Sequence, residues 1–543
     1  MKKTFLLFAA ISSLCFLSII SYSQTPAWLW AKSAGGIVDD FTASVATDAS
    51  GNAYIAGYFY SPTVTFDSIT IIKNPAGNNN NLFLAKYNAN GNILWAKSVG
   101  GTPYEYNNIV TSVAADASGN AYLTGYFNSI TLSFDSIILI NADSLNYAYN
   151  LFLAKYDPNG NVIWARSAGG PGPDWAYSIA ADASGNAYVA GWFHSPTITF
   201  GSITLTNADN TGNTEDLFLA KYDVNGNILW AKRAGGTNDD RAQAVVTDVS
   251  GNTYLIGNFA SPSISFGSTT LTNPLFLVKY NANGNVQWAK SADGTNSGVV
   301  SYISVDASGN TYLHGFFGGD SITFGSFTLI NPNPGSTPIL FLVKFDNGGN
   351  VQWLKEINSI IVSGDASGNT YGVGGIQNVG GNLTKYDSNG NILWSFITNS
   401  IHAQPYGSTV HTYVSIDATM NIYLAGWFMG DTLSFGPLDL FNVEHDGSRT
   451  DLFLTKLGSN TVINEFNNSL NISIYPDPAS DNITIVIPQK ATIEISNIQG
   501  QIIKSLKTKD NKTDIDISAF ANGVYIIRAQ TDSGITTKKF IKE

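Results

Sequence analysis

Four acidic residues recur at one position of a repeated segment and are the side chains best placed to do chemistry. Each follows the second glycine of a Trp-Ala-Lys-Ser-Ala-Gly-Gly-like segment by four residues, and they are Asp40, Glu105, Asp174 and Asp240. Aromatic residues lie beside them, among them Tyr104 and Trp175. Carboxylates next to aromatic rings can bind a cation, a sugar or a basic partner, and a suitably spaced pair can act as general acid and base.

A structural role is the second interpretation of these acids. Each carboxylate can accept hydrogen bonds from its own loop and so stabilise the connection between two repeats. Recurrence favours this role, because folding constrains every repeat whereas a binding site usually breaks the symmetry. The acid is missing from the fifth repeat, where Gly298 takes its place, and from the last two repeats. This one-sidedness favours binding, so both interpretations stay open.

Aromatic residues form a second candidate site, directly after a glycine that recurs in the repeats. The residues at this position are Tyr58, Tyr126, Trp192, Asn258, Phe316 and Trp427. Aromatic rings on one rim can stack on sugar rings. Packing between neighbouring repeats would select the same residue types, so this pattern does not by itself identify a ligand.

Other kinds of site find little support in the sequence. The five histidines are not spaced to bring two of them onto one metal ion, so no metal site is predicted. The repeated Asp-Ala-Ser-Gly-Asn segments resemble fragments of calcium loops, but each offers one acid, and a plain turn explains them better. Calcium is therefore the one cofactor left open. The sequence contains no Gly-x-Ser-x-Gly elbow and no phosphate loop, and no catalytic residue is predicted.

Two repeated segments indicate the elements that must position these residues. The first, Asp-Ala-Ser-Gly-Asn-x-Tyr-x-x-Gly-x-Phe, starts at Asp48, Asp116, Asp182, Asp248, Asp306, Asp365 and, in altered form, Asp417. The second reads Leu-Phe-Leu-Ala-Lys-Tyr-Asp-x-Asn-Gly-Asn-Ile-Leu-Trp-Ala-Lys. Alternating residues on both sides of a glycine-containing turn predict a hairpin in each segment, and hence four strands per repeat. A short extra ribbon, such as residues 198–205, lies between the two hairpins.

The tryptophan of the second segment follows only six of the repeats, and the seventh lies near the N-terminus, in Trp28-Leu-Trp-Ala-Lys. Both faces of the expected strands are apolar, so each sheet needs a neighbour on either side. Sheets stacked as blades around an axis provide these neighbours. The sequence therefore predicts an all-β, seven-bladed β-propeller over residues 24–457. In this fold Trp28 and Trp30 complete the last blade beside Phe453.

Composition and the N-terminal residues indicate an exported protein. Only 13% of the 543 residues are charged, and 52 Gly with 26 Tyr are typical of short strands and tight turns. Residues 1–23 have the basic start, apolar core and small-residue end of a secretory signal peptide. Its cleavage would remove Cys15, the only cysteine, so no disulfide is expected. The net charge of −12 argues against nucleic acid as a partner, and no transmembrane segment is expected in the mature chain.

The repeated segments also resemble a known family. Asp-x-Ser-Gly-Asn-x-Tyr followed by Trp-Ala-Lys-Ser-Ala-Gly-Gly is similar to the SBBP-type bacterial β-propeller repeat, over roughly residues 27–457. The resemblance implies a seven-bladed propeller and says little about activity. Gly372-Val-Gly-Gly375 departs most from the repeat, so the sixth blade is expected to be the weakest.

The residues after the repeats form a separate segment. Residues 458–470 are expected to be a linker, and short alternating strands with Pro and Gly turns predict a small β-sandwich over residues 471–543. Residues typical of a known domain recur in order along this segment, and they are Tyr475, Pro476, Pro478, Gly500, Gly523, Tyr525, Lys538 and Lys539. With them the segment is similar to the type A sorting domain of the type IX secretion system of Bacteroidota. The similarity implies recognition by the type IX machinery, passage across the outer membrane, and release or attachment to the cell surface.

The function expected from these observations is that of a secreted or cell-surface binding or scaffold protein without catalytic activity. It would engage glycans or proteins through one rim of the propeller. One alternative is a secreted carbohydrate-active hydrolase or lyase that uses the four acids. Another is a structural component of a surface layer or of a gliding apparatus. Acids paired at the separation that hydrolases require would favour the enzyme, and acids bonded to their own backbone would favour the scaffold.

Overall fold

The computed structural model describes residues 26–458 and 473–543, apart from 75–79, 103–107, 143–147, 210, 295–297, 375–381, 398–399, 403–408, 445–448, 488–489, 498–501, 509 and 532–533. The chain divides into two compact units, Met1–Ser459 and Asn460–Glu543, called here the N-terminal and the C-terminal unit. Every regular element in the described residues is a strand. A membrane-spanning helix is accordingly not found in this part of the chain.

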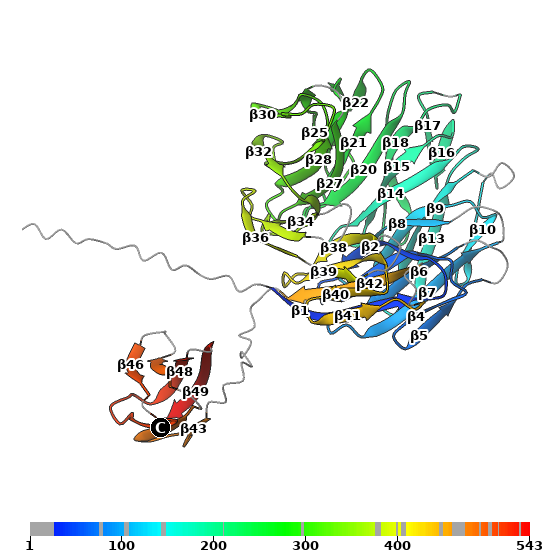
Figure 1. Cartoon of the computed structure of the whole chain (residues 1–543). Coiled ribbons are helices and arrows are strands. Elements are labelled where there is room, and N and C mark those ends of the chain that lie inside the picture. The colour runs from blue at the N-terminus through cyan, green and yellow to red at the C-terminus, as the bar shows by residue number, and fades with distance from the viewer. Residues whose placement is uncertain are drawn as a thin grey trace, which may run out of the picture. The chain divides into compact units, whose positions relative to one another are not determined.

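In the N-terminal unit the sequence repeats form antiparallel sheets with four main strands each, and ribbon strands extend two of these sheets to six strands (Figure 1). The first repeat contains β2 (Asp40–Thr47), β3 (Ala53–Phe59), β6 (Asn81–Tyr87) and β7 (Ile93–Gly101). The second contains β8 (Ile109–Ala115), β9 (Ala121–Phe127), β12 (Asn150–Tyr156) and β13 (Val162–Ala168). The third contains β14 (Asp174–Ala181), β15 (Ala187–Phe193), β18 (Asp216–Tyr222) and β19 (Ile228–Ala234), and the fourth β20 (Asp240–Thr247), β21 (Thr253–Phe259), β24 (Leu275–Tyr280) and β25 (Val286–Lys290).

The later repeats continue this pattern. The fifth contains β27 (Gly298–Val305), β28 (Thr311–Phe317), β31 (Ile339–Phe345) and β32 (Val351–Ile357). The sixth contains β33 (Ile360–Gly364), β34 (Thr370–Gly374), β35 (Asn382–Tyr386) and β36 (Ile392–Ile397). The last sheet is built from both ends of the unit, because β38 (Thr409–Ile416), β39 (Ile422–Met429) and β42 (Thr450–Gly458) are followed by β1 (Ala27–Gly35).

Two-stranded ribbons join the hairpins in the first five repeats and in the seventh. They are β4 (Thr63–Phe66) with β5 (Ile69–Ile72), β10 (Thr131–Phe134) with β11 (Ile137–Ile140), β16 (Thr197–Phe200) with β17 (Ile203–Thr206), β22 (Ile264–Phe266) with β23 (Thr269–Leu271), β29 (Ser321–Phe324) with β30 (Phe327–Ile330), and β40 (Thr432–Phe435) with β41 (Leu438–Phe441). The short strands β26 (Asp293–Gly294) and β37 (Ser400–His402) pair with β29 and β40. Because β4 pairs with β1 and β10 with β7, these ribbons cover the outer edge of the preceding sheet.

The Asp-Ala-Ser-Gly-Asn segment forms the turn of each first hairpin. In the first repeat the Oδ1 atom of Asp48 accepts hydrogen bonds from the backbone N–H groups of Ser50 and Asn52, at 3.0 and 2.9 Å. Gly51, with φ 74°, supplies the left-handed conformation of the turn. The same two bonds recur at Asp116, Asp182, Asp248, Asp306, Asp365 and Asp417. Each of these aspartates is thus bonded within its own turn.

A buried tyrosine from the same segment links consecutive repeats. The hydroxyl group of Tyr54 lies 2.6 Å from the carbonyl oxygen of Gly119 in the second repeat. In the seventh repeat the hydroxyl group of Tyr423 lies 2.6 Å from the carbonyl oxygen of Gly51 in the first. The seventh repeat is therefore bonded to the first in the same way as the first repeat is bonded to the second.

The tryptophan of the outer strand makes a second link of this kind. The indole N–H of Trp95 donates a hydrogen bond to the carbonyl of Pro158 in the next repeat, at 3.0 Å. Trp30 of β1 donates in the same way to Ala89 of the first repeat, at 3.1 Å. The N-terminal strand thus occupies the outer position of the sheet that precedes the first repeat.

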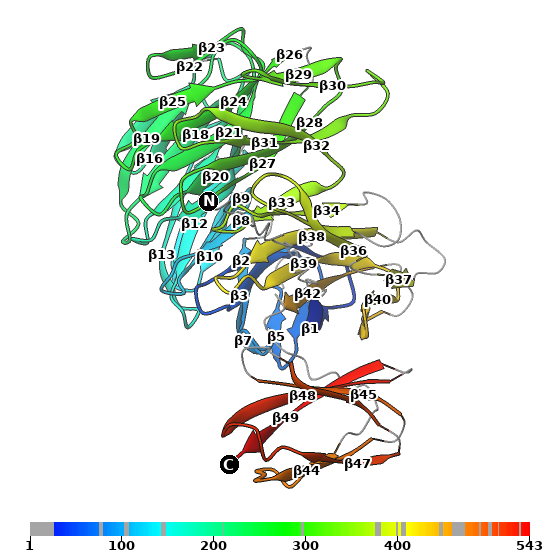
Figure 2. The same ribbon diagram turned by 90° about the vertical axis from the view of Figure 1, so that its left-hand side faces the viewer.

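Strand β1 pairs antiparallel with β42, and Figures 1 and 2 show the two strands side by side. The register sets Ser33 opposite Phe453. The ring of Trp28 lies 5.0 Å from that of Phe435 on the neighbouring ribbon. The three residues predicted to join the two ends of the unit therefore lie in this pair of strands.

The first strands of the repeats surround a cavity. β2, β8, β14, β20, β27, β33 and β38 contact one another in this order, and β38 also contacts β2. All of them line one cavity of about 610 Å³, called here the central cavity. The hydrophobic core lies between neighbouring sheets, where for example Leu84 of the first repeat clusters with Val113 and Phe152 of the second.

The C-terminal unit contains two antiparallel sheets with a common core. One consists of β43 (Ser473–Tyr475), β44 (Asn482–Val486) and β47 (Lys512–Asp516), and the other of β46 (Ile502–Lys507), β45 (Thr492–Asn497), β48 (Gly523–Thr531) and β49 (Gly534–Lys542). Ile483 and Ile515 of the first sheet pack with Ile493 and Ile527 of the second. Two sheets that bury their facing sides against each other form a β-sandwich.

Candidate ligand-binding site

The structure buries three of the predicted acids. Asp40, Asp174 and Asp240 are each 0% exposed. The Oδ2 atom of Asp40 accepts hydrogen bonds from the N–H of Gly36 and from the hydroxyl of Ser61, both at 2.9 Å. The same bonds recur in the third and fourth repeats. Because these carboxyl groups contact the protein and not solvent, their geometry fits the structural interpretation and not an exposed acidic rim.

Burial also changes the ionisation of these groups. It raises the pKa of Asp40 and Asp174 to about 7, and raises the pKa of Asp240 as well. Asp451 in β42 is likewise 0% exposed, and burial together with the charge of Asp40 raises its pKa to about 7. The Oδ1 atom of Asp451 has no hydrogen-bond partner among the described residues. Two buried carboxyl groups therefore interact where the first and last repeats meet.

In the second repeat a different residue takes the place of Asp40. Tyr104 and Glu105 lie outside the described residues. The Oδ1 atom of Asn108 accepts a hydrogen bond from the hydroxyl of Ser129 at 2.6 Å, which is the bond that Asp40 makes in the first repeat. Glu105 was predicted as the counterpart of Asp40 because it lies four residues after the second glycine. In this repeat the segment between that glycine and the first strand is longer, so the residue four positions on is not the structural equivalent. The counterpart is Asn108.

The residues after the recurrent glycine lie half-buried near the end of each second strand. Each of them lies opposite a residue at the start of the first strand. The opposed pairs are Tyr58 with Phe41, Tyr126 with Ile109, Trp192 with Trp175, Asn258 with Arg241, Phe316 with Val299 and Trp427 with His411. Both partners have aromatic rings in the first, third and seventh repeats. In the sixth repeat the equivalent position is Gly375, which lies outside the described residues. The rings are therefore concentrated on one side of the cavity.

Rings from the seventh and first repeats form one continuous group. His411 stacks on Trp427 with ring centroids 4.3 Å apart. Phe41 lies 5.3 Å from Trp427 and 5.3 Å from Tyr58, and Tyr60 lies 6.4 Å from Phe41. Of these residues, sequence analysis selected Tyr58 and Trp427.

Rings from the second and third repeats form another group. Tyr149 lies 5.2 Å from Tyr126, and Trp175 lies 6.3 Å from the same ring. Trp192 lies 5.9 Å from Trp175 and 5.0 Å from Tyr177, whose side chain is 43% exposed. The residues of these two groups, His411, Trp427, Phe41, Tyr58, Tyr60, Tyr126, Tyr149, Trp175, Tyr177 and Trp192, are called here the aromatic arc.

Tyrosine hydroxyl groups connect the aromatic arc to the central cavity. Burial raises the pKa of Tyr126 and of Tyr413, and the nearby Tyr58 and Tyr177 add to both shifts. Tyr177 and Tyr413 also line the central cavity. Burial raises the pKa of Tyr126 and Tyr413 to about 12, so both hydroxyl groups stay protonated at neutral pH. The arc therefore borders the cavity with neutral groups that can donate and accept hydrogen bonds.

The lining of the central cavity is uncharged and varies between repeats. The first strand has a β-bulge at the same place in the first five repeats, and the bulged residues Ala43, Thr111, Tyr177, Gln243 and Ser301 all line the cavity. A bulge redirects a side chain out of the regular alternation. Among the described residues, no Asp, Glu, Lys, Arg or His contributes to the lining. The cavity thus offers hydroxyl, amide and small apolar groups.

The charged groups described beside the aromatic arc have partners of opposite charge. The guanidinium of Arg241 lies 5.6 Å from the centre of the Trp192 ring, bonds Glu215, and lies 3.5 Å from Asp239. In the seventh repeat Arg449 lies 3.3 Å from Asp39. The arc itself therefore presents rings and hydroxyl groups, and both arginines at its edge are paired with carboxylates.

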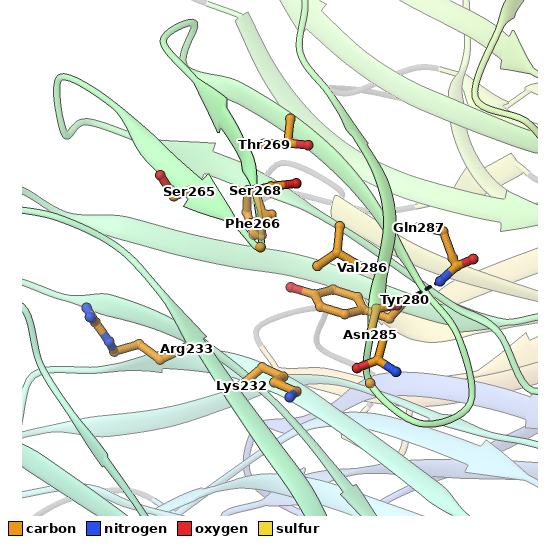
Figure 3. A pocket seen from close by; sticks show the side chains of 12 residues that line it. Lys232, Arg233, Ser265, Phe266, Ser268, Thr269, Tyr280, Asn285, Val286 and Gln287 are labelled. Atoms are coloured by element: carbon orange, nitrogen blue, oxygen red, sulfur yellow. Dashed lines mark hydrogen bonds between the residues drawn. The ribbon is translucent and has the colours of Figure 1, made fainter.

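A smaller cavity of about 300 Å³ lies on the outer side of the fourth repeat (Figure 3). Lys232 and Arg233 of β19 lie on one side, and Ser265 of the ribbon and Gln287 of β25 also line it. Arg233 forms an ion pair with the buried Asp216 at 2.5 Å. Lys232 belongs to the repeated Trp-Ala-Lys segment, so this cavity is made largely of features that the fold repeats. It is the weaker candidate site.

Two of the described histidines, His314 and His194, lie beside polar side chains of the repeats. The Nδ1 atom of His314 lies 2.9 Å from the hydroxyl of Ser301, and burial lowers the pKa of His314 to about 4. His194 lies 4.0 Å from Glu215. In the described residues, no three His, Cys, Asp or Glu side chains gather in a way that could hold a metal ion.

The predicted sorting residues lie on both sheets of the C-terminal unit. Tyr475 ends β43 and precedes Pro476 and Pro478, Gly523 and Tyr525 begin β48, Lys538 and Lys539 are exposed on β49, and Gly500 lies outside the described residues. The ring of Tyr525 stacks on Phe540 with centroids 5.6 Å apart, and its hydroxyl donates to the carbonyl of Ala521 at 2.8 Å. Tyr525 therefore helps to hold β48 and β49 together.

Comparisons with known proteins find distant relatives. The chain is 27% identical over 406 residues to an uncharacterized WD repeat-containing protein of Acanthamoeba polyphaga mimivirus, covering 62% of this chain and 29% of that protein. It is 27% identical over 173 residues to the regulatory protein FlaEY of Caulobacter vibrioides, covering 32% of this chain and 17% of that protein. The chain thus spans less than a third of the length of either relative.

Solved structures resemble the chain more loosely. PorZ, a surface component of the type IX secretion system of Porphyromonas gingivalis, is 11% identical with a TM-score of 0.26, over 92% of this chain and 81% of that one. The β-propeller domain of the trilobed protease from Pyrococcus furiosus is 6% identical with a TM-score of 0.34, over 75% of this chain and 94% of that one.

Two family models match defined parts of the chain. Residues 163–192, from β13 to β15, match the beta-propeller repeat. Residues 473–543, the described part of the C-terminal unit, match the secretion system C-terminal sorting domain. This domain directs export by the type IX secretion system to the cell surface or the extracellular space. The chain is therefore an exported protein that contains the SBBP beta-propeller repeat and a type IX C-terminal sorting domain.

Proposed function

We propose that the N-terminal unit is a closed, seven-bladed propeller that binds an extracellular ligand at the aromatic arc without catalysing a reaction. Three contacts support closure of the ring. Strand β1 pairs with β42, β38 contacts β2, and Trp30 bonds Ala89 across the junction. In a closed ring of this kind every sheet has a neighbour on each face, and only short, protected sheet edges remain.

The observation that supports binding most strongly is the aromatic arc at the edge of the central cavity. Packing between repeats alone would place similar residues in every repeat, yet in the part of the chain that the structure describes the arc is confined to the seventh, first, second and third. Half-buried rings with hydroxyl groups beside a concave space suit the stacking of sugar rings or of apolar side chains. Glycans and proteins of the cell surface are ligands that an exported protein meets.

The acids support a binding protein better than a hydrolase. A glycoside hydrolase needs two carboxyl groups that flank the scissile bond. Asp40, Asp174 and Asp240 are buried, and each is bonded to its own loop. The C-terminal unit has a separate role in this proposal, because residues 471–543 would contact the type IX secretion machinery.

A binding screen tests the proposal. Mature protein (residues 24–543) is applied to arrays of polysaccharides and of purified extracellular proteins, together with the double variant Trp192→Ala/Trp427→Ala. Trp288→Ala is the matched control, because Trp288 lies outside the arc and bonds the next repeat through Asn347. We expect the double variant to lose at least about 10-fold in affinity, as a hot-spot aromatic pair would, and the control to bind as wild type.

The outcome against the proposal is a wild-type protein that binds no member of the arrays, or a double variant that binds as well as wild type. Circular dichroism and thermal unfolding show whether each variant is folded. We expect removal of calcium by EDTA to leave binding unchanged, because the repeat aspartates are already bonded within their turns.

A further inference from the structure

The central cavity and the aromatic arc together indicate the class of ligand. We propose that the cavity receives the end of a neutral saccharide chain, while the following sugar rings stack on the arc. This inference rests on the proposed function and makes it more specific. It excludes saccharides whose recognition depends on carboxylate or sulfate groups.

The charge of the lining is the first argument. A charged group that leaves water needs an opposite charge or several hydrogen bonds to compensate for its lost hydration. The described lining contains no charged side chain, and Arg241 at the edge of the arc is already held by Glu215 and Asp239. An uncharged ligand is therefore the one that this cavity can accept at low cost.

The hydrogen-bonding groups are the second argument. Sugars present many hydroxyl groups, each of which can donate and accept. Tyr177 and Tyr413 line the cavity at the arc, and Thr111, Gln243 and Ser301 line it from other repeats. The cavity volume of about 610 Å³ lies within the usual range of small-molecule sites, roughly 300–1,000 Å³. This is space for a chain end and not for a folded partner protein.

The variation of the bulged residues is the third argument. The bulge itself recurs, so the fold determines the direction of these side chains. Their types differ in each of the first five repeats, from Ala43 to Tyr177, so the fold does not determine what they are. Positions that share a backbone conformation but differ in chemistry are suited to set specificity. Ala43 leaves room in the cavity that a tyrosine at the same position would fill.

The natural residues at the bulge provide matched variants. Ala43→Tyr introduces the residue of the third repeat and should block the cavity while every residue of the arc is kept. Ala43→Ser introduces the residue of the fifth repeat and should leave the cavity open. Gln243→Tyr is a second blocking variant, from another repeat, in case the first one does not fold.

The experiment measures affinity of the mature protein by calorimetry. The probes are linear neutral α- and β-glucan oligosaccharides, the same backbones after carboxymethylation or sulfation, and cyclic glucans of the same linkage, which have no chain end. We expect linear neutral chains to bind at least about 10-fold more tightly than charged or cyclic ones. Ala43→Tyr should lower the affinity for linear chains at least about 10-fold, and Ala43→Ser should not.

Several outcomes would overturn the inference. One is preferential binding of the charged chains, and another is equal binding of linear and cyclic chains. A third is a folded Ala43→Tyr or Gln243→Tyr variant that binds as wild type. In each of these cases the proposed function still stands if Trp192→Ala/Trp427→Ala abolishes binding, and it falls if that double variant binds as wild type.

Discussion

A disulfide across the junction of β1 and β42 would test closure of the ring directly. Ala31 and Thr455 lie opposite each other in these strands, and the only natural cysteine, Cys15, is absent from a chain that starts at residue 24. Opposite residues in antiparallel strands have Cα separations that a disulfide can span. We therefore expect Ala31→Cys/Thr455→Cys to oxidise in the folded protein.

The size of the effect follows from the length of chain that the disulfide encloses. About 420 residues lie between the two positions, for which the chain-entropy relation gives about 6 kcal/mol. The matched control is Ala85→Cys/Ala96→Cys, at the equivalent register position of the first repeat. It encloses about 12 residues and gives about 3 kcal/mol. For a unit of about 430 residues these values correspond to increases in Tm of about 7 and about 3 °C.

The assay compares each variant with itself. Thermal unfolding is measured for the oxidised and the reduced form of each protein, so that the effects of the substitutions cancel. Mass spectrometry after thiol labelling reports whether the disulfide has formed. The ring would be refuted if the cysteines at positions 31 and 455 stayed reduced under conditions that oxidise the control pair. It would also be refuted if oxidation left the Tm of the junction variant unchanged.

Two further predictions concern the buried carboxyl groups and the turns. The native pKa of Asp451 is about 7, whereas its ordinary value is 3.8. The wild-type native state therefore loses stability as pH rises from about 4 to 7. Over that range the unfolding free energy of Asp451→Asn should increase relative to wild type by up to about 4 kcal/mol, and above pH 7 the difference should stay constant. Urea unfolding at pH 4 to 8 measures the unfolding free energy of both proteins. A difference between Asp451→Asn and wild type that is the same at every pH would contradict the raised pKa and the coupling of Asp451 to Asp40. Gly226 has φ +75° and an added Cβ would lie 2.6 Å from Trp164, whereas Gly335 has φ +77° and open space, so Gly226→Ala should destabilise by about 2–4 kcal/mol and Gly335→Ala by about 1 kcal/mol. Thermal unfolding of both variants measures these effects. Equal losses of stability would show that the contact with the ring of Trp164 is unimportant.

The repeated segments made much of the fold predictable. Their alternation and glycine turns correspond to the two hairpins of each repeat, and Trp30 indicated where the N-terminal strand belongs. These features are local in sequence, or recur often enough to be recognised. Which sheets adjoin was also indicated, because both faces of the strands are apolar.

The site was less predictable, for physical reasons. Burial of Asp40 depends on how the loop folds over it, which spacing alone does not show. The bulge that directs Tyr177 into the cavity interrupts the alternation that identifies a strand, so the sequence did not indicate that this residue faces the cavity. Tyr149 contacts the arc from a loop outside the repeated segments. Glu105 was selected because an insertion shifted the count, and Asn108 occupies the position.

The pairing of β1 with β42 also determines when the protein can finish folding. Strand β1 is translated first, and at about 5–20 residues per second its partner follows about 20–80 s later. Until then Trp28 and Trp30 have no sheet to join, and contacts so distant in sequence form slowly. A chain interrupted at any point before β42 keeps an open sheet edge and an unpaired apolar segment. Proteases and chaperones recognise such features, so β42, the last strand of the N-terminal unit to be translated, reports on the completeness of that unit.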